Sequence, residues 1–278
     1  MKRNFIFLIT IFCFLSLFTR PVFADVGPKP SVTIIVENAP EKSYYVTLLA
    51  KRSYGPWHQV AGIEEMPVNS EEEKKAAQLF LDYEDKNGFF LLSNMSGDLK
   101  GKNEFSWTYY PPEEFKVAIC TPDDGTVYVS EALEREAFYS YFRVTYGSDP
   151  LVAQEESHLG RVFLESLLRV AVTIAVELFL AYLFGYREKK QLLTIGIVNI
   201  VTQMILNAFL VFCDYFGGAL MWMIMFPIGE IIVCVIELIV YLFTIGKGKK
   251  GKAFLYTLLA NAASAAFTFI GMVAAWAR

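Results

Sequence analysis

Eight polar side chains interrupt the apolar second half of the sequence, and their types suit the binding of protons, cations or small polar solutes. Three of them are carboxylic acids, Glu177, Glu230 and Glu237. A carboxylate inside a membrane is costly unless it is neutralised or paired, so such residues favour a functional site. This predicted polar layer consists of Glu177, Asn199, Thr202, Gln203, Glu230, Glu237, Tyr241 and Asn261.

The spacing of these residues predicts that they share helix faces. Asn199 and Gln203 are four residues apart, and Glu230, Glu237 and Tyr241 fall within about 60° of one another at about 100° per residue. One polar residue from each of four apolar stretches lies eight or nine residues from the same end, about 12–14 Å deep at about 1.5 Å per residue. The four stretches are therefore predicted to contribute to one layer inside a bundle.

Arg169 is the only basic residue within these stretches that could neutralise a carboxylate. It is expected to form an ion pair with Glu165, one turn before it, or to reach Glu230. One guanidinium cannot pair with all three carboxylates of the layer, so some of them must be protonated, meet a cation or meet a polar substrate. The alternative is interhelical hydrogen bonding by protonated glutamates, worth about 0.6 kcal/mol per contact.

The four apolar stretches, each long enough to span a membrane with some tilt, are residues 162–186, 191–213, 219–245 and 253–276. Short connections rich in basic residues occupy 187–190 and 246–252. Because positive charge marks cytoplasmic loops, these two connections are predicted to be cytoplasmic, with the C-terminus outside. The expected second domain is therefore a four-helix transmembrane bundle, residues 158–278.

The N-terminus predicts export of the preceding half of the chain. Residues 1–24 combine a basic start, an apolar run and small residues before Asp25, which is typical of a signal peptide. Residues 25–160 then hold 12 basic and 23 acidic side chains, a balance that disfavours nucleic-acid binding. Cys120 is the only cysteine in this region, so no internal disulfide is expected there.

Short β-prone runs separated by turn residues predict a β-sandwich-like extracytoplasmic domain over residues 25–157. One helix is predicted over 70–84, because Ser70 with Glu73 forms a capping box, and a second over 133–142. A last strand is expected at 143–146, and Asp123-Asp-Gly125 predicts a hairpin turn. The predicted strands are 31–37, 43–49, 89–92, 105–109, 116–121 and 126–130.

No catalytic constellation, metal site or cofactor motif is legible in this domain. His58 has no second histidine or cysteine at ligand spacing, so a surface-loop histidine is favoured over a metal ligand. Residues 71–73 (EEE) are interpreted as a helix start rather than a calcium loop. Trp107, Tyr109 and Tyr110 either form an aromatic binding platform or, as their alternation favours, pack in the core.

Several segments together resemble a group of uncharacterised signal-peptide-bearing four-helix membrane proteins of Gram-positive bacteria. They are residues 25–31 (DVGPKPS), 105–112 (FSWTYYPP), 185–192 (GYREKKQL), 198–207 (VNIVTQMILN) and the spacing of Glu230, Glu237 and Tyr241. The resemblance implies an extracytoplasmic domain on a four-helix membrane module in the plasma membrane, and it implies no particular activity.

These features predict a multi-domain α+β membrane protein. No nucleophile–base pair is legible, so an intramembrane enzyme is the least favoured of three hypotheses. In the first hypothesis the exported domain binds a partner or ligand, and the bundle anchors it or relays its occupancy. In the second the chain is a transporter or permease subunit that uses the polar layer for protons, cations or a small polar solute. The expected partners are the lipid bilayer and a protein partner or second copy through the helices, without nucleic acid or cofactor.

Overall fold

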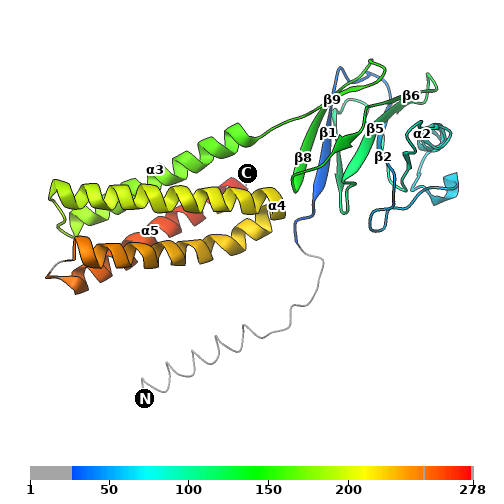
Figure 1. Ribbon diagram of the computed structural model, residues 1–278. Helices are drawn as coiled ribbons and strands as arrows, with labels where there is room; N and C mark the ends of the chain where they lie inside the picture. Colours follow the sequence, from blue (N-terminus) through cyan, green and yellow to red (C-terminus); the bar gives the residue numbers. More distant parts are fainter. Residues whose placement is uncertain (1–26, 247, 277–278) are drawn as a thin grey trace.

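The computed structural model describes residues 27–246 and 248–276 (Figure 1). A β-rich region is followed by long apolar helices, as the sequence predicts. The predicted signal peptide, residues 1–24, lies outside the described residues.

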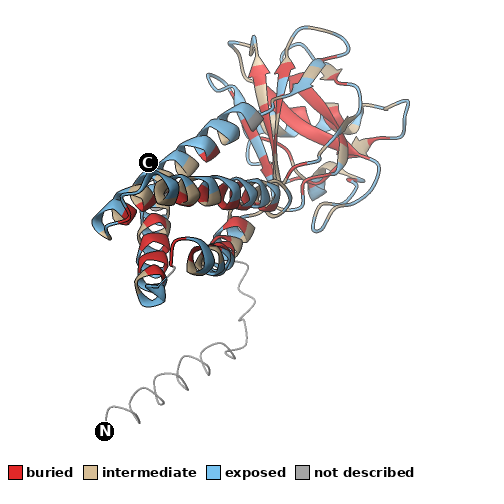
Figure 2. Cartoon of the chain, turned by 60° about the vertical axis from the view of Figure 1, so that its left-hand side comes forward, coloured by how far each residue is buried: buried red, intermediate tan, exposed pale blue. Residues whose placement is uncertain are grey.

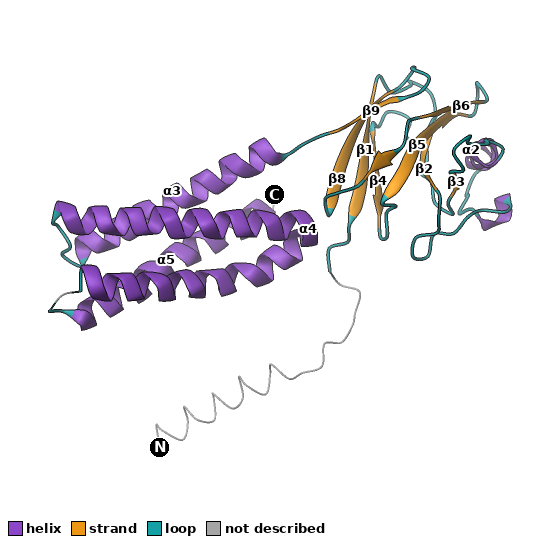
Figure 3. Cartoon of the chain, in the orientation of Figure 1, coloured by secondary structure: helices purple, strands orange, loops and turns teal. Residues whose placement is uncertain are grey.

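Nine strands form two sheets in the β-rich region (Figure 3). They are β1 (Ser31–Glu37), β2 (Tyr45–Ala50), β3 (Phe90–Leu91), β4 (Glu104–Thr108), β5 (Glu114–Thr121), β6 (Thr126–Val129), β7 (Leu133–Glu134), β8 (Tyr139–Thr145) and β9 (Val152–Glu155). The first sheet has the order β4–β1–β8–β9, in which β1 and β8 run parallel. The second has the order β3–β2–β5–β6, with β7 also paired to β5.

The two sheets face each other across a hydrophobic core. Ile34 of β1 and Trp107 of β4 are fully buried on the first sheet, because alternate residues of a strand point to the same side. Phe115 and Phe142 meet edge to face from opposite sheets, with ring centroids 5.2 Å apart. The β-sandwich arrangement follows from this shared core.

A helix covers the other face of the second sheet, which explains why β2 is buried on both faces. This helix, α2 (Glu71–Leu81), begins after Ser70, whose hydroxyl accepts the N–H of Glu73 at 3.1 Å. Its inner side, including Phe80, packs against Tyr45 and Cys120. Burial raises the pKa of the Cys120 thiol, so this cysteine is a packing residue rather than a nucleophile.

The predicted helix over 133–142 is wrong, and the hairpin turn before it is confirmed. Gly125 adopts a φ of 64° between β5 and β6. Further along, Leu133 pairs with Phe115, and Tyr139 begins a seven-residue parallel ladder on β1 that starts opposite Ser31. The partner strand lies about a hundred residues earlier, so local periodicity could not reveal it; β9 escaped the sequence pattern as well.

Three apolar helices follow: α3 (Leu159–Leu183), α4 (Lys189–Thr244) and α5 (Lys250–Trp276). Each is long and apolar enough to cross a membrane by length and composition, so the described residues hold three candidate spans, and the predicted count of four is not confirmed. The difference arises because α4 includes two predicted stretches without an intervening loop. Gly218 alone leaves the helical region, with φ 68° and ψ −171°, and there the chain reverses (Figure 1).

We call residues 189–217 the first arm of α4 and residues 219–244 its second arm. The two arms pack together through a cluster of apolar side chains that includes Leu206, Trp222 and Phe226. Large apolar side chains such as Ile205 and Ile231 are instead exposed on the outside of the helices. Figure 2 shows exposed residues along the outer faces of these helices. An apolar exterior over a partly polar interior is the arrangement that suits contact with lipid.

Candidate functional site

Six of the eight predicted polar-layer residues are joined by hydrogen bonds in the interior of the bundle. Asn199, on the first arm of α4, lies at the centre of one group. Its Nδ2 donates to Oε2 of Glu177 on α3 at 2.7 Å and to the hydroxyl of Tyr241 on the second arm at 3.0 Å. Glu177, Asn199 and Tyr241 are all fully buried.

Glu237 lies at the centre of a second group. Its Oε1 accepts the hydroxyl hydrogen of Thr202 at 2.7 Å, and its Oε2 accepts Nδ2 of Asn261, on α5, at 2.9 Å. The Thr202 hydroxyl also lies 3.2 Å from the backbone oxygen of Asn199, so the two groups are adjacent. The layer therefore receives side chains from α3, both arms of α4 and α5, as the equal depths of these residues predicted.

The polar layer has more acceptors than donors. Oε1 of Glu177, Oδ1 of Asn199 and Oδ1 of Asn261 are buried without a hydrogen-bond partner among the described residues. Carboxylate and amide oxygens accept hydrogen bonds, and buried polar atoms are normally satisfied. A proton, a cation or water molecules would supply the donors or positive charge that these three oxygens lack.

No hydrogen bond among the described residues joins Gln203 and Glu230, the other two predicted residues, to either group. Both line a small cavity of about 10 Å³, roughly the space for one water molecule, which we call the Gln203 cavity. Nε2 of Gln203 and Oε2 of Glu230 have no hydrogen-bond partner among the described residues. The residues that line the Gln203 cavity therefore include one unpartnered donor and one unpartnered acceptor.

The predicted ion pair between Glu165 and Arg169 does not form, and Arg169 does not pair with Glu230 either. Glu165 accepts Nε of Arg161 at 2.9 Å, one turn earlier on α3. Arg169 instead donates from Nε to Oδ1 of Asn207 at 3.1 Å and from Nη2 to the hydroxyl of Ser166 at 2.9 Å. Within the described part of the chain, Arg169 has no carboxylate within 4 Å.

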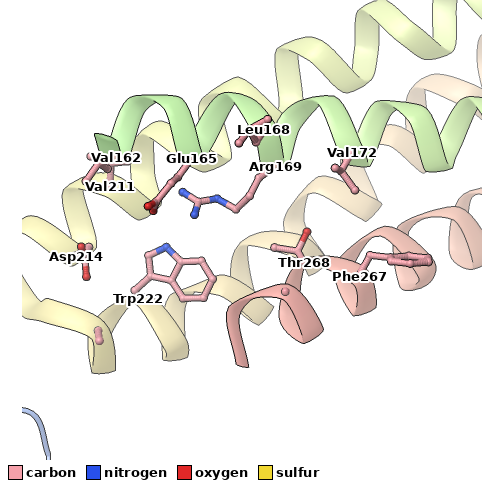
Figure 4. Close-up of a pocket in the computed structure, with 12 residues that line it drawn as sticks. Val162, Glu165, Leu168, Arg169, Val172, Val211, Asp214, Trp222, Phe267 and Thr268 are labelled. Carbon is pink, nitrogen blue, oxygen red and sulfur yellow. The ribbon is translucent and has the colours of Figure 1, made fainter. Parts of the chain in front are cut away.

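Arg169 faces a pocket of about 510 Å³ between the helices, which we call the Arg169 pocket. Figure 4 shows its guanidinium near Glu165, Asp214 and the ring of Trp222. The described lining residues are Val162, Glu165, Leu168, Arg169, Val172, Val211, Asp214, Ala219, Trp222, Phe267, Thr268 and Gly271. Arg169, Trp222 and Thr268 also line the Gln203 cavity, so the two spaces adjoin.

Sequence reasoning missed Asn207 and Tyr256. Asn207 lies four residues after Gln203, so the helical spacing that grouped Asn199 with Gln203 carried the signal for it. The hydroxyl of Tyr256 donates to the backbone oxygen of Glu177 at 3.3 Å, a contact between α5 and α3 that no spacing within α5 reveals.

The β-rich region brings together His58, Glu65 and Ser93, which the sequence analysis did not connect. Nε2 of His58 lies 3.2 Å from Glu65, and Nδ1 lies 3.3 Å from both the Ser93 hydroxyl and the Pro56 carbonyl. A carbonyl only accepts, so Nδ1 must carry a hydrogen to bond it. Ser93 is buried and also accepts the backbone N–H of His58, so this group does not present an activated nucleophile.

The aromatic residues near β4 differ in burial, and no observation tests the proposed binding platform. Trp107 is buried in the core, whereas Tyr110 is half exposed. Trp57 donates its indole N–H to the backbone oxygen of Tyr109 at 2.6 Å, so the exposed segment is held against the domain. In the described residues no three His, Cys, Asp or Glu side chains approach closely enough to hold a metal ion.

The fold and the polar layer define a class of protein: a β-sandwich joined to a bundle of long apolar helices with a hydrogen-bonded polar interior. No protein-family model, no curated protein and no solved structure matches the chain. The resemblance to the four-helix membrane proteins of Gram-positive bacteria therefore stays a prediction.

Glu237 provides a direct test of how the polar layer contributes to stability. Glu237→Leu is expected to lower the free energy of unfolding by about 1–3 kcal/mol, because Thr202 and Asn261 lose a buried acceptor. Glu237→Gln keeps an acceptor and is expected to cost less than about 1 kcal/mol. Thermal unfolding in detergent measures both, with Ile239→Leu on the exposed surface as control; equal stability of the Leu and Gln variants would contradict the hydrogen-bonding role.

Proposed function

We propose that this chain is an integral protein of a bacterial plasma membrane whose exported β-sandwich binds a partner or ligand and whose bundle anchors it and relays its occupancy. In this proposal α3, the two arms of α4 and α5 make four membrane crossings. The connections 187–190 and 246–252 are cytoplasmic, and residues 25–157 and the C-terminus are outside.

The observation that carries the proposal is a direct contact between the β-sandwich and the turn of α4. The backbone N–H of Phe138 donates to the backbone oxygen of Tyr215 at 2.8 Å, and the Tyr215 hydroxyl lies 3.3 Å from Glu136. The ring of Phe138 lies against Gly218. Because Gly218 is the residue of α4 that leaves the helical region, this contact gives ligand binding at the β-sandwich a physical route into the bundle.

The route continues along α4 from this contact. Asp214 precedes Tyr215 and lines the Arg169 pocket, together with Trp222 four residues after Gly218. A shift of the turn would therefore change the Arg169 pocket and the adjoining Gln203 cavity. This supports a relay rather than a passive anchor.

The arrangement of basic residues supports the proposed orientation. Arg187, Lys249 and Lys252 line one hollow at the end of the bundle, with the Lys252 ammonium 4.4 Å from the centre of the Tyr186 ring. The β-sandwich lies at the opposite end of the bundle (Figure 1). Basic residues at one end and an exported domain at the other agree with the positive-inside rule.

Cysteine labelling in intact cells tests this orientation. Lys100→Cys, exposed in the β-sandwich, is expected to react with a membrane-impermeant thiol reagent, whereas Glu188→Cys and Lys250→Cys react only after lysis. The parent chain is the matched control, because among the described residues Cys120 and Cys213 are buried and Cys234 is partly buried, and Cys13 belongs to the proposed signal peptide. Labelling of Lys250→Cys in intact cells would refute the proposed topology.

The second candidate function, transport of protons or small cations, is favoured by the unpartnered oxygens of the polar layer. In liposomes containing a pH-sensitive dye, the full chain is expected to carry protons down an imposed gradient. Glu237→Gln should abolish this flux while the protein still inserts, and Glu188→Gln, exposed in a connection, should not. Wild-type protein without proton or monovalent-cation flux would exclude this candidate.

A further inference from the structure

The Arg169 pocket combines one guanidinium, two carboxylates and an apolar wall. We propose that it binds the headgroup of an aminophospholipid, with the phosphate at Arg169 and the ammonium between Glu165 and Asp214. This inference rests on the proposed membrane insertion of the bundle. The pocket volume of about 510 Å³ lies within the range of small-ligand sites, about 300–1,000 Å³.

Arg169 is prepared to receive an anionic group. Asn207 and Ser166 hold its Nε and Nη2, which orients the guanidinium, while no described residue hydrogen-bonds Nη1. Trp222 stacks beside it, with the guanidinium carbon 5.9 Å from the ring centre. An arginine fixed by neutral partners retains its full charge for a phosphate oxygen.

The two carboxylates determine which anion fits. A headgroup that carries only negative charge would contact Glu165 and Asp214 as well as Arg169. The two carboxylates would repel it (Figure 4). A headgroup with an ammonium group instead places its N–H donors on these carboxylates. Arg161 occupies Oε1 of Glu165 only, which leaves Oε2 to accept.

The apolar wall argues for a lipid rather than a free zwitterion. Leu168 and Phe267 line the pocket and are each 59% exposed on the outside of the bundle. Val172 lies beside them and is 47% exposed. Acyl chains leaving the pocket would pass over these side chains into the surrounding bilayer, whereas a free solute would leave them uncovered.

Lipid-dependent thermal unfolding of the purified full chain in detergent tests the assignment. Phosphatidylethanolamine is expected to raise the melting temperature with saturation, and phosphatidylglycerol, which lacks the amine, to do so at least tenfold more weakly. Free phosphoethanolamine should have no effect at matched concentration. Equal effects of the two lipids would overturn the proposal, and stabilisation by phosphoethanolamine alone would replace the lipid by a free zwitterion.

Two variants and a matched control connect the effect to the pocket. Arg169→Gln is expected to weaken phosphatidylethanolamine binding at least tenfold, whereas Arg187→Gln, which removes the same charge from a separate hollow at the other end of the bundle, changes it less than twofold. Asp214→Asn, a milder change should Arg169→Gln fail to fold, should reduce the preference for phosphatidylethanolamine over phosphatidylglycerol. An unchanged preference in Asp214→Asn would overturn the assignment.

The labelling experiment separates this proposal from the proposed topology. If Lys100→Cys and Lys250→Cys label as expected and no headgroup preference is found, only the lipid site fails. If the labelling is reversed, the membrane orientation on which the site depends fails first.

Discussion

Replacing Lys116 by methionine is expected to lower the free energy of unfolding of the β-sandwich by about 3–5 kcal/mol, since it leaves a buried carboxylate without its partner. The Lys116 ammonium lies 2.8 Å from Oδ2 of Asp85 and 3.0 Å from Oδ1 of Asn87. The two charged side chains are only 7% and 2% exposed. Amide hydrogen exchange in β-sandwich peptides of the full chain measures the loss.

The control for this prediction is an ion pair at the surface. Lys51 and Glu114 lie 2.7 Å apart, but both side chains are more than 40% exposed. Lys51→Met is therefore expected to cost less than about 1 kcal/mol. If the two methionine variants lost equal stability, burial would not be the reason that the Lys116 pair matters.

The same pair predicts how the β-sandwich responds to acid. Burial acts to raise the pKa of Asp85, but the bonds from Lys116 and from the backbone N–H groups of Asn87 and Phe89 outweigh it and lower the pKa below its ordinary value. A carboxyl with a lowered folded-state pKa stabilises the fold above its unfolded-state pKa of about 3.9, and this contribution is lost as pH falls toward the folded-state pKa. Asp85→Asn should therefore reduce the acid-induced fall in melting temperature; an unchanged profile would contradict the assignment.

Local patterns predicted those elements of the fold that depend on neighbouring residues. Alternation along 31–37 predicted β1, and the hydroxyl of Ser70 marked the start of α2. The segment 133–142 was assigned to a helix because its partners are distant in sequence: β7 pairs with β5, and β8 pairs with β1. The Lys116–Asp85 pair was invisible for the same reason, since Asp85 lies 31 residues before Lys116 and outside any strand.

More of the polar layer than of the residues around it could be predicted from the sequence. Helical period and equal depth are properties of each stretch alone, and they brought Glu177, Asn199, Glu237 and Asn261 into contact range. The partner of Arg169 depended on how α3 packs against the first arm of α4. There the neutral side chain of Asn207 accepts a hydrogen bond from the Arg169 guanidinium. Glu165, one turn before Arg169 on α3, pairs with Arg161 instead.

Gly218→Ala is expected to lower the free energy of unfolding by about 2–5 kcal/mol and to disturb the contact between the β-sandwich and the bundle. With φ 68° and ψ −171°, Gly218 occupies a backbone region that only glycine adopts readily, at a cost of about 1–3 kcal/mol for other residues. A Cβ at this position would also lie 2.5 Å from Cδ1 of Phe138, so the ring must move. Gly196→Ala, with no atom within 4 Å of its added Cβ, is the matched control and should be neutral or slightly stabilising.

The unfolding of the Gly218→Ala variant distinguishes a relay from an anchor. If the Phe138–Tyr215 contact couples the two parts, the wild-type β-sandwich and helices should unfold in one transition, and the variant should separate it into two. Amide hydrogen exchange, measured separately in peptides from the β-sandwich and in peptides from the helices, would follow each part. Two transitions already present in the wild type would show that the contact transmits nothing, and the exported β-sandwich would then be a domain that the helices only anchor.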